Sequence, residues 1–564
     1  MPGLFATPPT AGSLGRGQPY NPTMYFHETF TADEERLLQR FFTNTDRPVF
    51  ALINLPEVVK GALFARYSRS PKSLRRLLLD EFINEADTGI AAMASQMESG
   101  DSTIDVQRAE RLYSRVFSEY GDDSVAQLGG AHIACEQASN ILTKILEWGR
   151  LAAYLEQSTR YIFYDRKLGD RFRYLLPPEV RGTPLEAEVA GELDRLFETY
   201  SSVVREFVTY FETRFPKQAT DSDSVWRSAI RAKACDAARG LLPAATLSNV
   251  GVFASGQAYE QMLLRMRAHP LQETRDYADM MLEELRKVIP SFLRRVDVPE
   301  RGGAWSDYFD STARRTAELA AQLTSGESPA PSAEVTLVDW DPDAEVKTAA
   351  AALYASTSLS DAQLLDVARR MSADDRAKVI ATYVGDRSNR RHRPGRGMER
   401  SYYRFDVLSD FGSFRDLQRH RMLTVEWQRL GTLHGYTTPP EIDEIGRRGA
   451  WDEAMGRMAS LGSRLAAEFG PEVAQYVVPF AYRLRYVMEF NTREAFHMLE
   501  LRTSQQGHPD YRRICQEMHR LIGEQAGHRA LAGAMKYVDH DSYGLERIEA
   551  ERRSEQRRNA AGKS

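Results

Sequence analysis

The sequence is poor in cysteine and has no long apolar run. Its three cysteines, Cys135, Cys235 and Cys515, lie far apart, so they offer neither a disulfide framework nor paired zinc ligands. No apolar stretch approaches the ~20 residues that span a bilayer, and the Pro- and Gly-rich N-terminus lacks the apolar segment of a signal peptide. These absences exclude membrane, secreted and fibrous proteins and favour a cytoplasmic one.

An excess of charge of one sign is also missing. The chain has 74 Lys and Arg residues against 79 Asp and Glu, a net charge of −5. This balance excludes a polybasic protein that coats nucleic acid, but it does not exclude a local basic patch. With 564 residues, 42% of them hydrophobic, the chain is globular and long enough for roughly two to four domains.

One segment, TSGESPAPSAE at 324–334, is typical of a linker because Ser, Pro, Gly and Ala favour turns over packed structure. The remainder is helix-rich with short β-branched stretches such as VTLVDW, which favours an α+β fold. We expect five parts in order: a flexible arm at 1–30, a first domain at 31–323 with an insertion near 177–225, the linker at 324–334, a second domain at 335–545, and a charged tail at 546–564.

The two sides of the linker resemble each other. LLRMRAHP (263–270) and LELRTSQQGHP (499–509) are both helix-like stretches that end in Arg and then His-Pro. A turn followed by an amphipathic helix reaches Tyr67 on one side and Tyr354 on the other. The pattern predicts a degenerate tandem repeat of one domain.

The second half holds the densest signal for chemistry, RDLQRHRMLTVEWQR (415–429). Two guanidiniums and an imidazole, Arg419, His420 and Arg421, could bind a phosphate and a ring, although a solvated basic helix end explains the tripeptide more simply. In EFNTREAFHMLELR (489–502), a helix would place Asn491 and Arg502 on one apolar face. A buried capping Asn and a surface Arg are the alternative.

The corresponding place in the first half is EWGRLAAYLEQSTRY (147–161). Arg150, Glu156, Ser158 and Arg160 could bind a nucleoside monophosphate: Glu156 would accept from the sugar or base, Ser158 would donate to the ring, and Arg160 would meet the phosphate. An amphipathic helix with an i,i+4 pair between Glu156 and Arg160 explains the stretch equally well.

The Arg419-His420-Arg421 tripeptide resembles the signature of flavin-dependent thymidylate synthases, in which Arg-His-Arg is followed by seven residues and a serine. In the second half Arg429 stands in place of that serine. In the first half seven residues separate Arg150 from Ser158, but Trp148 and Gly149 replace the first Arg and the His. Each half therefore keeps a different part of one motif.

Further positions match the same family. Asn491 and Arg493 match its Asn-x-Arg, Arg502 its pyrimidine-contacting arginine and Arg485 another nucleotide contact, while His497 stands where the family usually has Asn. In the first half LLPAATLSN (241–249) and Arg267 match, but Gly256-Gln257-Ala258 replaces the Asn-x-Arg. The resemblance implies two tandem copies of the family's α+β domain, each helix-rich around a small antiparallel sheet.

The resemblance also implies a reaction, the reductive methylation of dUMP to dTMP with FAD, NADPH and methylenetetrahydrofolate, without a catalytic cysteine or a metal. It implies a homodimer that acts as a pseudo-tetramer, with a site composed from both halves. The implied residues are Arg502 and Ser158 for catalysis; Arg419, His420, Arg421, Asn491, Arg493 and His497 for the flavin; and Arg150, Glu156, Ser158, Arg160, Arg267, Arg485 and Arg502 for the substrate.

Two other functions stay open. The departures from the motif are compatible with a divergent relative that binds flavin or a pyrimidine nucleotide without synthase activity. A second possibility is a nucleic-acid contact through the Arg-rich stretch 386–404, which contains Arg387, Arg390, Arg391, Arg393, Arg396, Arg400 and Arg404. A solvated basic loop, or a loop that binds a cofactor phosphate, explains the same stretch, so nucleic acid is the less favoured partner.

Overall fold

The computed structural model describes residues 28–46, 50–55, 57, 59–60, 63–64, 72–83, 127 and 129–561. Most of the predicted arm at 1–30 and part of the predicted helix to Tyr67 lie outside this range. The chain forms two compact units, one of Met1–Ala131, Ala254–Glu260 and Leu282–Val298, and one of His132–Phe253, Gln261–Met281 and Pro299–Ser564. All predicted site residues lie in the second unit, and no described helix is long and apolar enough to cross a membrane.

The second half is built on a four-stranded antiparallel sheet. Its strands are β4 (Val335–Trp340), β5 (Tyr402–Asp410), β6 (Leu423–Trp427) and β7 (Arg483–Asn491), in the order β4-β5-β7-β6. Along β5 buried Tyr403, Phe405 and Val407 alternate with more exposed polar residues, the period of two expected of a strand with one covered face. The predicted small antiparallel sheet is confirmed.

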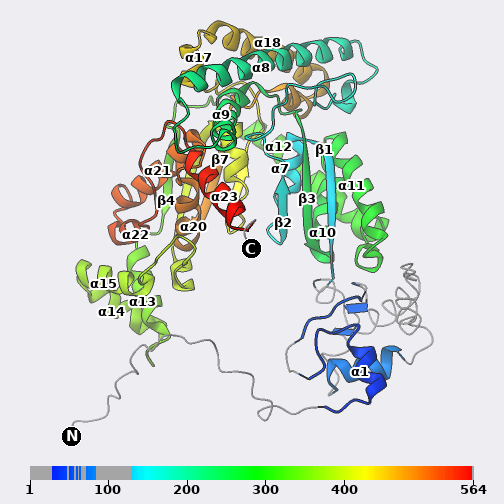
Figure 1. Cartoon of the computed structure of the whole chain (residues 1–564), viewed down its shortest axis with the longest axis vertical. Coiled ribbons are helices and arrows are strands. Elements are labelled where there is room, and N and C mark those ends of the chain that lie inside the picture. The colour runs from blue at the N-terminus through cyan, green and yellow to red at the C-terminus, as the bar shows by residue number, and fades with distance from the viewer. Residues whose placement is uncertain are drawn as a thin grey trace. The chain divides into compact units, whose positions relative to one another are not determined.

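Helices cover the buried face of this sheet (Figure 1). Two of them follow a strand directly, α16 (Phe411–Leu417) after β5 and α20 (Thr492–Arg502) after β7. A third, α21 (Pro509–Glu524), packs against β4. The remaining helices of this half are α13 (Ala344–Tyr354), α14 (Asp361–Arg370), α15 (Ala373–Val384), α17 (Pro440–Glu444), α18 (Arg448–Phe469), α19 (Pro471–Ala474) and α22 (Arg529–Ala534).

The first half repeats this order of elements. Strands β1 (Gly130–Ser139), β2 (Ala152–Glu156) and β3 (Leu247–Ser255) form a sheet in the order β1-β3-β2. This order corresponds to β5-β7-β6 in the second half. The associated helices are α7 (Asn140–Leu146), α8 (Glu186–Arg214), α9 (Asp223–Ala238), α10 (Gly256–Arg267), α11 (Gln272–Arg286) and, after them, α12 (Ala304–Leu323). The predicted α+β tandem repeat is therefore present in the structure.

The expected insertion near 177–225 mostly contains α8, which has a counterpart in the second half. Helix α8 lies beside α18 (Figure 1), and ion pairs from Arg457 to Glu192 and from Arg464 to Glu188 join the two. The additional helix of the first half is instead α9, where the second half has only the short α19. The charged tail forms α23 (Ile548–Ala561), and its Arg552 pairs with Asp221 at 2.6 Å.

The two halves meet along their equivalent Leu-Pro and Val-Pro turns. Pro243 and Pro479 form an antiparallel bridge, in which the Ala244 N–H donates to the Val478 carbonyl at 2.9 Å and the Phe480 N–H donates to the Leu242 carbonyl at 2.8 Å. Just before this bridge, a Cβ on Gly240 would lie 2.6 Å from the Trp451 ring, so only glycine allows this close approach. The halves are thus joined by backbone as well as by side chains.

Candidate functional site

The Arg419-His420-Arg421 tripeptide lies in the short connection between α16 and β6. It does follow a helix, as the simpler interpretation proposed, but it is not a solvated helix end, because His420 is buried. Its Nδ1 is 2.7 Å from a carboxylate oxygen of Glu494, and its Nε2 is 2.9 Å from the Nε of Arg502. His420 therefore links the segment after α16 to the beginning and to the end of α20.

These contacts fix the protonation of His420. The Arg502 Nε–H can only donate, so His420 Nε2 must accept and Nδ1 carries the proton that is donated to Glu494. Burial and the charge of Arg502 lower the pKa of His420 to about 4, despite the opposing hydrogen bond to Glu494. Burial would raise the pKa of Glu494, but its hydrogen bonds with His420 and His497 lower that pKa to about 2. A neutral imidazole thus faces an ionised carboxylate.

His420, Glu494 and His497 have the geometry of a potential metal site, with ligand atoms within 4.8 Å of one another. His497 Nδ1 lies 3.2 Å from both carboxylate oxygens. A metal on His420 Nδ1 would leave a proton on Nε2, which would then face the Arg502 Nε–H donor. The residues fit a hydrogen-bonded chain better than a metal centre.

The Asn-x-Arg residues organise the start of α20. Asn491 caps the helix, because its Oδ1 accepts the backbone N–H of Glu494 at 2.9 Å. Arg493 donates to the Pro394 carbonyl at 3.0 Å and pairs with Glu399 at 3.2 Å. In the first half the residue with the same capping role is Ser255, whose Oγ accepts the Ala258 N–H at 3.3 Å. The sequence alignment, which placed Gly256 opposite Asn491, is one residue out of register.

In the first half, Glu156 is the last residue of β2 and its carboxylate is fully buried. One oxygen accepts from Arg415 at 2.8 Å, and the other lies 3.2 Å from both Lys144 and Arg419. Burial would raise the pKa of Glu156, but these three cations hold it well below its usual value. The alternative i,i+4 pair between Glu156 and Arg160 is wrong because the stretch forms a strand and a loop instead of a helix.

Arg160 points to a different carboxylate. It donates to both oxygens of Asp236, at 2.7 and 2.6 Å, and to the hydroxyl of Tyr511 at 2.9 Å. The guanidiniums of Arg160 and Arg502 each lie 5.6 Å from the centre of the Tyr511 ring. The Ser158 Oγ accepts the backbone N–H of Arg160 at 3.2 Å. Predicted residues from both halves therefore meet within one chain, without a second subunit.

We call these residues the buried ion network. Six basic side chains share four carboxylates in it: Lys144, Arg160, Arg239, Arg415, Arg419 and Arg502 with Glu147, Glu156, Asp236 and Asp416. Most of these side chains are nearly inaccessible, but Arg419 is 33% exposed and Arg502 is 15% exposed. The surplus positive charge therefore reaches solvent at these two guanidiniums.

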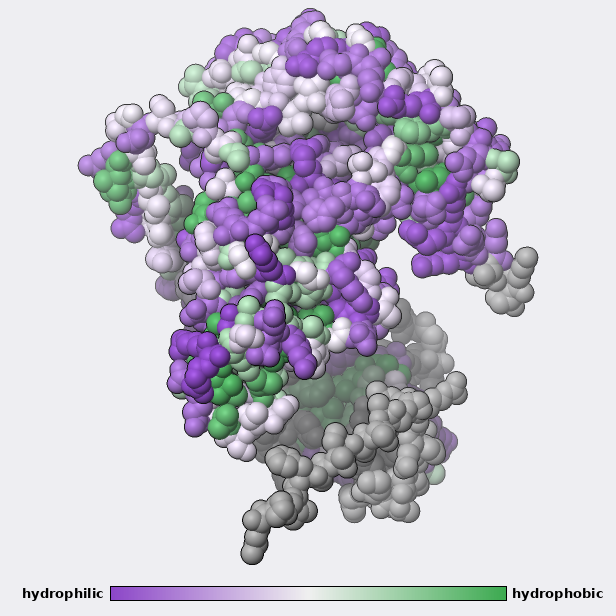
Figure 2. All heavy atoms as spheres, turned by 90° about the vertical axis from the view of Figure 1, so that its left-hand side faces the viewer, coloured by the Kyte–Doolittle hydropathy of each residue, from purple (hydrophilic) through white to green (hydrophobic). Residues whose placement is uncertain are grey.

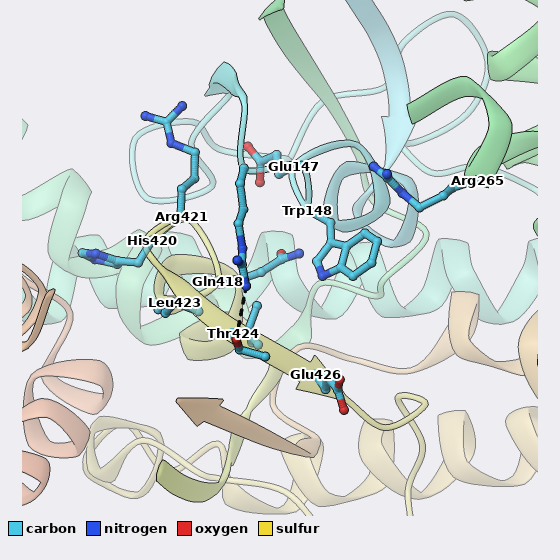
Figure 3. A pocket seen from close by; sticks show the side chains of 12 residues that line it. Glu147, Trp148, Arg265, Gln418, His420, Arg421, Leu423, Thr424 and Glu426 are labelled. Atoms are coloured by element: carbon cyan, nitrogen blue, oxygen red, sulfur yellow. Dashed lines mark hydrogen bonds between the residues drawn. The ribbon is translucent and has the colours of Figure 1, made fainter. Parts of the chain in front are cut away.

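A cavity of about 340 Å³ adjoins the network (Figure 3). His420 and Arg421 lie on one side of it, and Trp148 and Arg265 lie on the other. Arg150 donates to Thr424 Oγ1 at 3.1 Å, and Arg421 donates to the Ala152 carbonyl. Neither of these two arginines, nor Arg265, pairs with a carboxylate of the described residues. Glu147, which pairs with Lys144, and Glu426 also line the cavity. The three arginines still leave a surplus of positive charge, which suits an anion on their side of the cavity.

Two predicted residues are engaged elsewhere. Arg485 pairs with Asp406 at 2.9 Å and donates to Ser332 on the outer side of the sheet, and Arg267 pairs with Asp279. Neither is bonded to the buried ion network or lines the cavity.

Several residues of the site were not predicted from the sequence: Trp148 as a cavity wall, Arg265, Asp236, Asp416, Glu494 and Tyr511. Only Glu494 left a local signal, since it precedes His497 by three residues on a helix. The three cysteines are buried, and burial raises the pKa of the Cys135 and Cys515 thiols to about 12. Thiols held in the protonated form in this way are poor nucleophiles.

The Arg-rich stretch is partly structural. Arg387 is buried and forms a double hydrogen bond with Glu500, while Arg396, Arg400 and Arg404 pair with surface carboxylates. Among the seven arginines, Arg390, Arg391 and Arg393 have no carboxylate partner in the described chain. The stretch therefore offers three free cations, a smaller basic surface than its composition indicated.

Comparison with known proteins places the chain in a family. Residues 77–291 and 336–526 match the family described as thymidylate synthase complementing protein. A UPF0159 protein of Chlamydia pneumoniae is 40% identical over 531 residues, 94% of this chain and 98% of the relative. A UPF0159 protein of Thermoplasma acidophilum is 29% identical over 519 residues, 87% of this chain and 97% of the relative.

Among solved structures, a UMP/dUMP methylase from Streptomyces cacaoi bound with 5-Br dUMP is 20% identical, and the match covers 35% of this chain and 94% of that one. Its TM-score of 0.27 is too low to support an argument. The family match, by contrast, falls once in each half and spans the repeated elements. The chain belongs to the thymidylate synthase complementing protein family and carries two tandem copies of its domain.

Proposed function

We propose that the chain catalyses the reductive methylation of dUMP to dTMP with FAD, NADPH and methylenetetrahydrofolate. The observation that carries this proposal is the surplus of cations at the site. Arg419 and Arg502 are the most exposed cations of the buried ion network. The cavity bordered by His420 adds the guanidiniums of Arg150 and Arg421, which have no carboxylate partner among the described residues. Guanidiniums in this arrangement fit a phosphate together with a pyrimidine that becomes anionic.

The proposed roles follow from burial. Arg502, held by His420 Nε2 and lying 3.8 Å from Asp416, stabilises negative charge on the pyrimidine. Arg150 binds the phosphate, and Ser158 contacts the ring. Glu156 and Arg160 were expected to touch the substrate, but both are buried and bonded within the chain. We therefore assign them to positioning Arg419 and Tyr511.

The donor chemistry of the second half fits a flavin. Arg419, Arg421, Asn491, Arg493 and His497 would hold it, since their N–H groups match the carbonyl and phosphate oxygens of FAD. His420, whose two ring nitrogens are engaged by Glu494 and Arg502, would hold these groups in place. The Arg493 side chain is 32% exposed and that of His497 is 27% exposed, so both can reach a ligand. When bound, the flavin would carry reducing equivalents from NADPH to the methylation. The chain's own groups supply binding, orientation and charge.

We also propose that the active form is a cytoplasmic homodimer. The sheet of the first half has an outer face with exposed apolar residues, including Leu155 at 80% and Phe253 at 45% exposure. A second copy would bury these side chains. Replacing Leu155 with Lys is expected to shift the protein from dimer to monomer in sedimentation velocity, because a charge cannot be buried in such a contact. An unchanged dimer would show that this face is not the interface.

An absorbance experiment tests the activity directly. Purified protein with FAD should show flavin absorption that bleaches with NADPH, faster when dUMP is present, and dTMP should form once methylenetetrahydrofolate is added. Arg419→Ala and Ser158→Ala should each abolish dTMP formation. Arg464→Ala, which removes only a surface pair with Glu188, is the matched control and should retain it. Full activity after removal of the entire first half would contradict the composite site.

The departures from the motif favour one alternative, a relative that has lost synthase activity. Arg429, in place of the serine, is exposed and pairs with Glu472 at 2.7 Å, so the second copy has no serine to offer. Protein that stays colourless with FAD would support this alternative and exclude the flavoenzyme. Salt-dependent retention on immobilised nucleic acid, reduced by neutralising Arg390, Arg391 and Arg393, would instead support the nucleic-acid function.

A further inference from the structure

A second cavity lies beside the first and has a different character. It measures about 320 Å³, shares Trp148, Arg265, Val425 and Glu426 with the first cavity, and extends between β6 and α10. Its walls include Trp148, Trp427, Met262 and Met266. Aromatic faces and polarisable sulfur form a slot suited to a flat apolar ring. A volume of this size is within the usual range of small-molecule sites.

Arg265 is the unusual residue of this slot. Its guanidinium lies 4.8 Å from the centre of the Trp148 ring, but among the described residues no carboxylate or other hydrogen-bond acceptor is paired with it. It is half-buried, and this burial lowers its pKa below that of a free arginine. A half-buried cation without a partner is costly, and an anion from outside would relieve that cost.

The remaining polar groups restrict where the anion can lie. Glu426 is exposed on β6 and borders the same cavity, so it repels an anion on its own side. His269 also borders the cavity, but burial and the charge of Arg275 lower its pKa to about 4, and the imidazole is neutral at pH 7. The negative group of a ligand is therefore directed to Arg265, on the α10 side.

We propose that this second cavity binds an aromatic carboxylate, whose ring enters the slot beside Trp148 and whose carboxylate pairs with Arg265. The proposed nucleotide function uses other residues, because neither Arg150, Arg421 nor the buried ion network lines this second cavity. The first copy of the domain lacks the Arg-His of the motif, and Trp148 stands within that gap. The degenerate first copy thus contributes to a cavity that prefers an aromatic carboxylate over a nucleotide.

The experiment uses 2-naphthoate and its neutral isostere 2-naphthamide as probes, titrated into the full chain by calorimetry. The wild-type chain should bind the acid about tenfold more tightly than the amide, a difference of about 1.4 kcal/mol. Arg265→Met keeps the apolar stem but removes the charge, and should weaken the acid to the level of the amide while leaving the amide unchanged. Trp148→Ala should weaken both probes.

Arg150→Met is the matched control, since it removes an equal charge from the adjoining cavity, and it should leave naphthoate binding unchanged. Retained binding of the amide by Arg265→Met shows that the slot itself is intact. The proposal is overturned if the wild-type chain binds neither probe or binds both equally. It is also overturned if Arg150→Met weakens the acid as much as Arg265→Met does, or if both probes still bind to Trp148→Ala as they do to the wild type.

Discussion

His420 illustrates how one side chain can be fixed in a single state by its neighbours. Its two ring nitrogens face a donor, Arg502, and an ionised acceptor, Glu494. Protonating the ring would place two donors against each other and would charge a buried group. We expect His420 to stay neutral, with the proton on Nδ1, throughout the range from pH 5 to 8.

Nitrogen-15 NMR of protein labelled only at histidine would test this. One imidazole should show an unprotonated Nε2 and a protonated Nδ1, with no titration above pH 5, and His420→Gln identifies the signal by its loss. A ring that protonates near pH 6.5, as a free histidine does, would contradict the assignment.

Glu156 gives a prediction about stability. It compensates Arg415, Lys144 and Arg419 at one buried point, so Glu156→Gln leaves a surplus of buried positive charge. We expect the free energy of unfolding to fall by about 3–5 kcal/mol, measured by urea denaturation. Glu188→Gln, which breaks an exposed pair with Arg464, should change it by less than about 1 kcal/mol. Equal effects of the two substitutions would show that the network is not energetically special.

The sequence identified many of these residues but not their partners. Arg419, His420 and Arg502 could be selected because they match a motif, and the structure brings them together. The partner of Arg160 is Asp236, 76 positions away along the chain. Such a pair depends on how α9 packs, which local spacing does not encode. The nearest carboxylate in sequence, Glu156, was therefore a plausible but incorrect choice.

The beginning of α20 shows the same limit for a whole element. Asn491 was selected as a flavin ligand, yet its Oδ1 caps the helix that carries His497 and Arg502. Asn491→Asp preserves the capping oxygen, whereas Asn491→Ala removes it and should cost about 0.5–2 kcal/mol of stability. Both variants lose the side-chain amide N–H that would face a flavin.

Comparing the two variants separates the roles. The midpoint temperature of thermal unfolding should be lowered only in Asn491→Ala. The affinity for FAD, measured by fluorescence titration, should be weakened in both variants. If Asn491→Asp binds FAD as the wild type does, the amide N–H is not a flavin contact.

Element boundaries were easier to foresee where chemistry limits the choices. The helix expected to include Asn491 and Arg502 is present as α20, but it begins at Thr492, because Asn491 ends β7 and caps the helix. The insertion expected near 177–225 falls largely on α8, which shares a buried apolar face with α18 but little recognisable sequence. Packing requires only that apolar residues recur every three or four positions, so the helix can persist while the identities of its residues change.

At the scale of the molecule, buried histidines predict sensitivity to acid. Burial lowers the pKa of His269, His420 and His508 to about 4, whereas the unfolded chain titrates near 6.5. Between these values the unfolded chain binds more protons, so stability falls as the pH falls. Each histidine contributes up to roughly 3 kcal/mol. Asp410, whose pKa burial and Asp510 raise to about 6, opposes only part of this loss.

Chemical denaturation at several pH values would check the expected trend. The free energy of unfolding should be constant from about pH 7 upward to pH 8 and should fall steeply between pH 6.5 and 4. A value that is unchanged over the acidic range would mean that these imidazoles are not held neutral.

The bridge between Pro243 and Pro479 bears on ancestry. Antiparallel pairing of equivalent segments is what a two-fold axis imposes on two identical chains. An ancestor with a single copy of the domain would have placed this segment against itself, and each of its mutations would have appeared at two sites at once. Fusion into one chain removed that coupling, so one copy could lose its serine and the other its Arg-His. If the chain acts on the nucleotide proposed above, one composite site per chain predicts a stoichiometry of one nucleotide per chain.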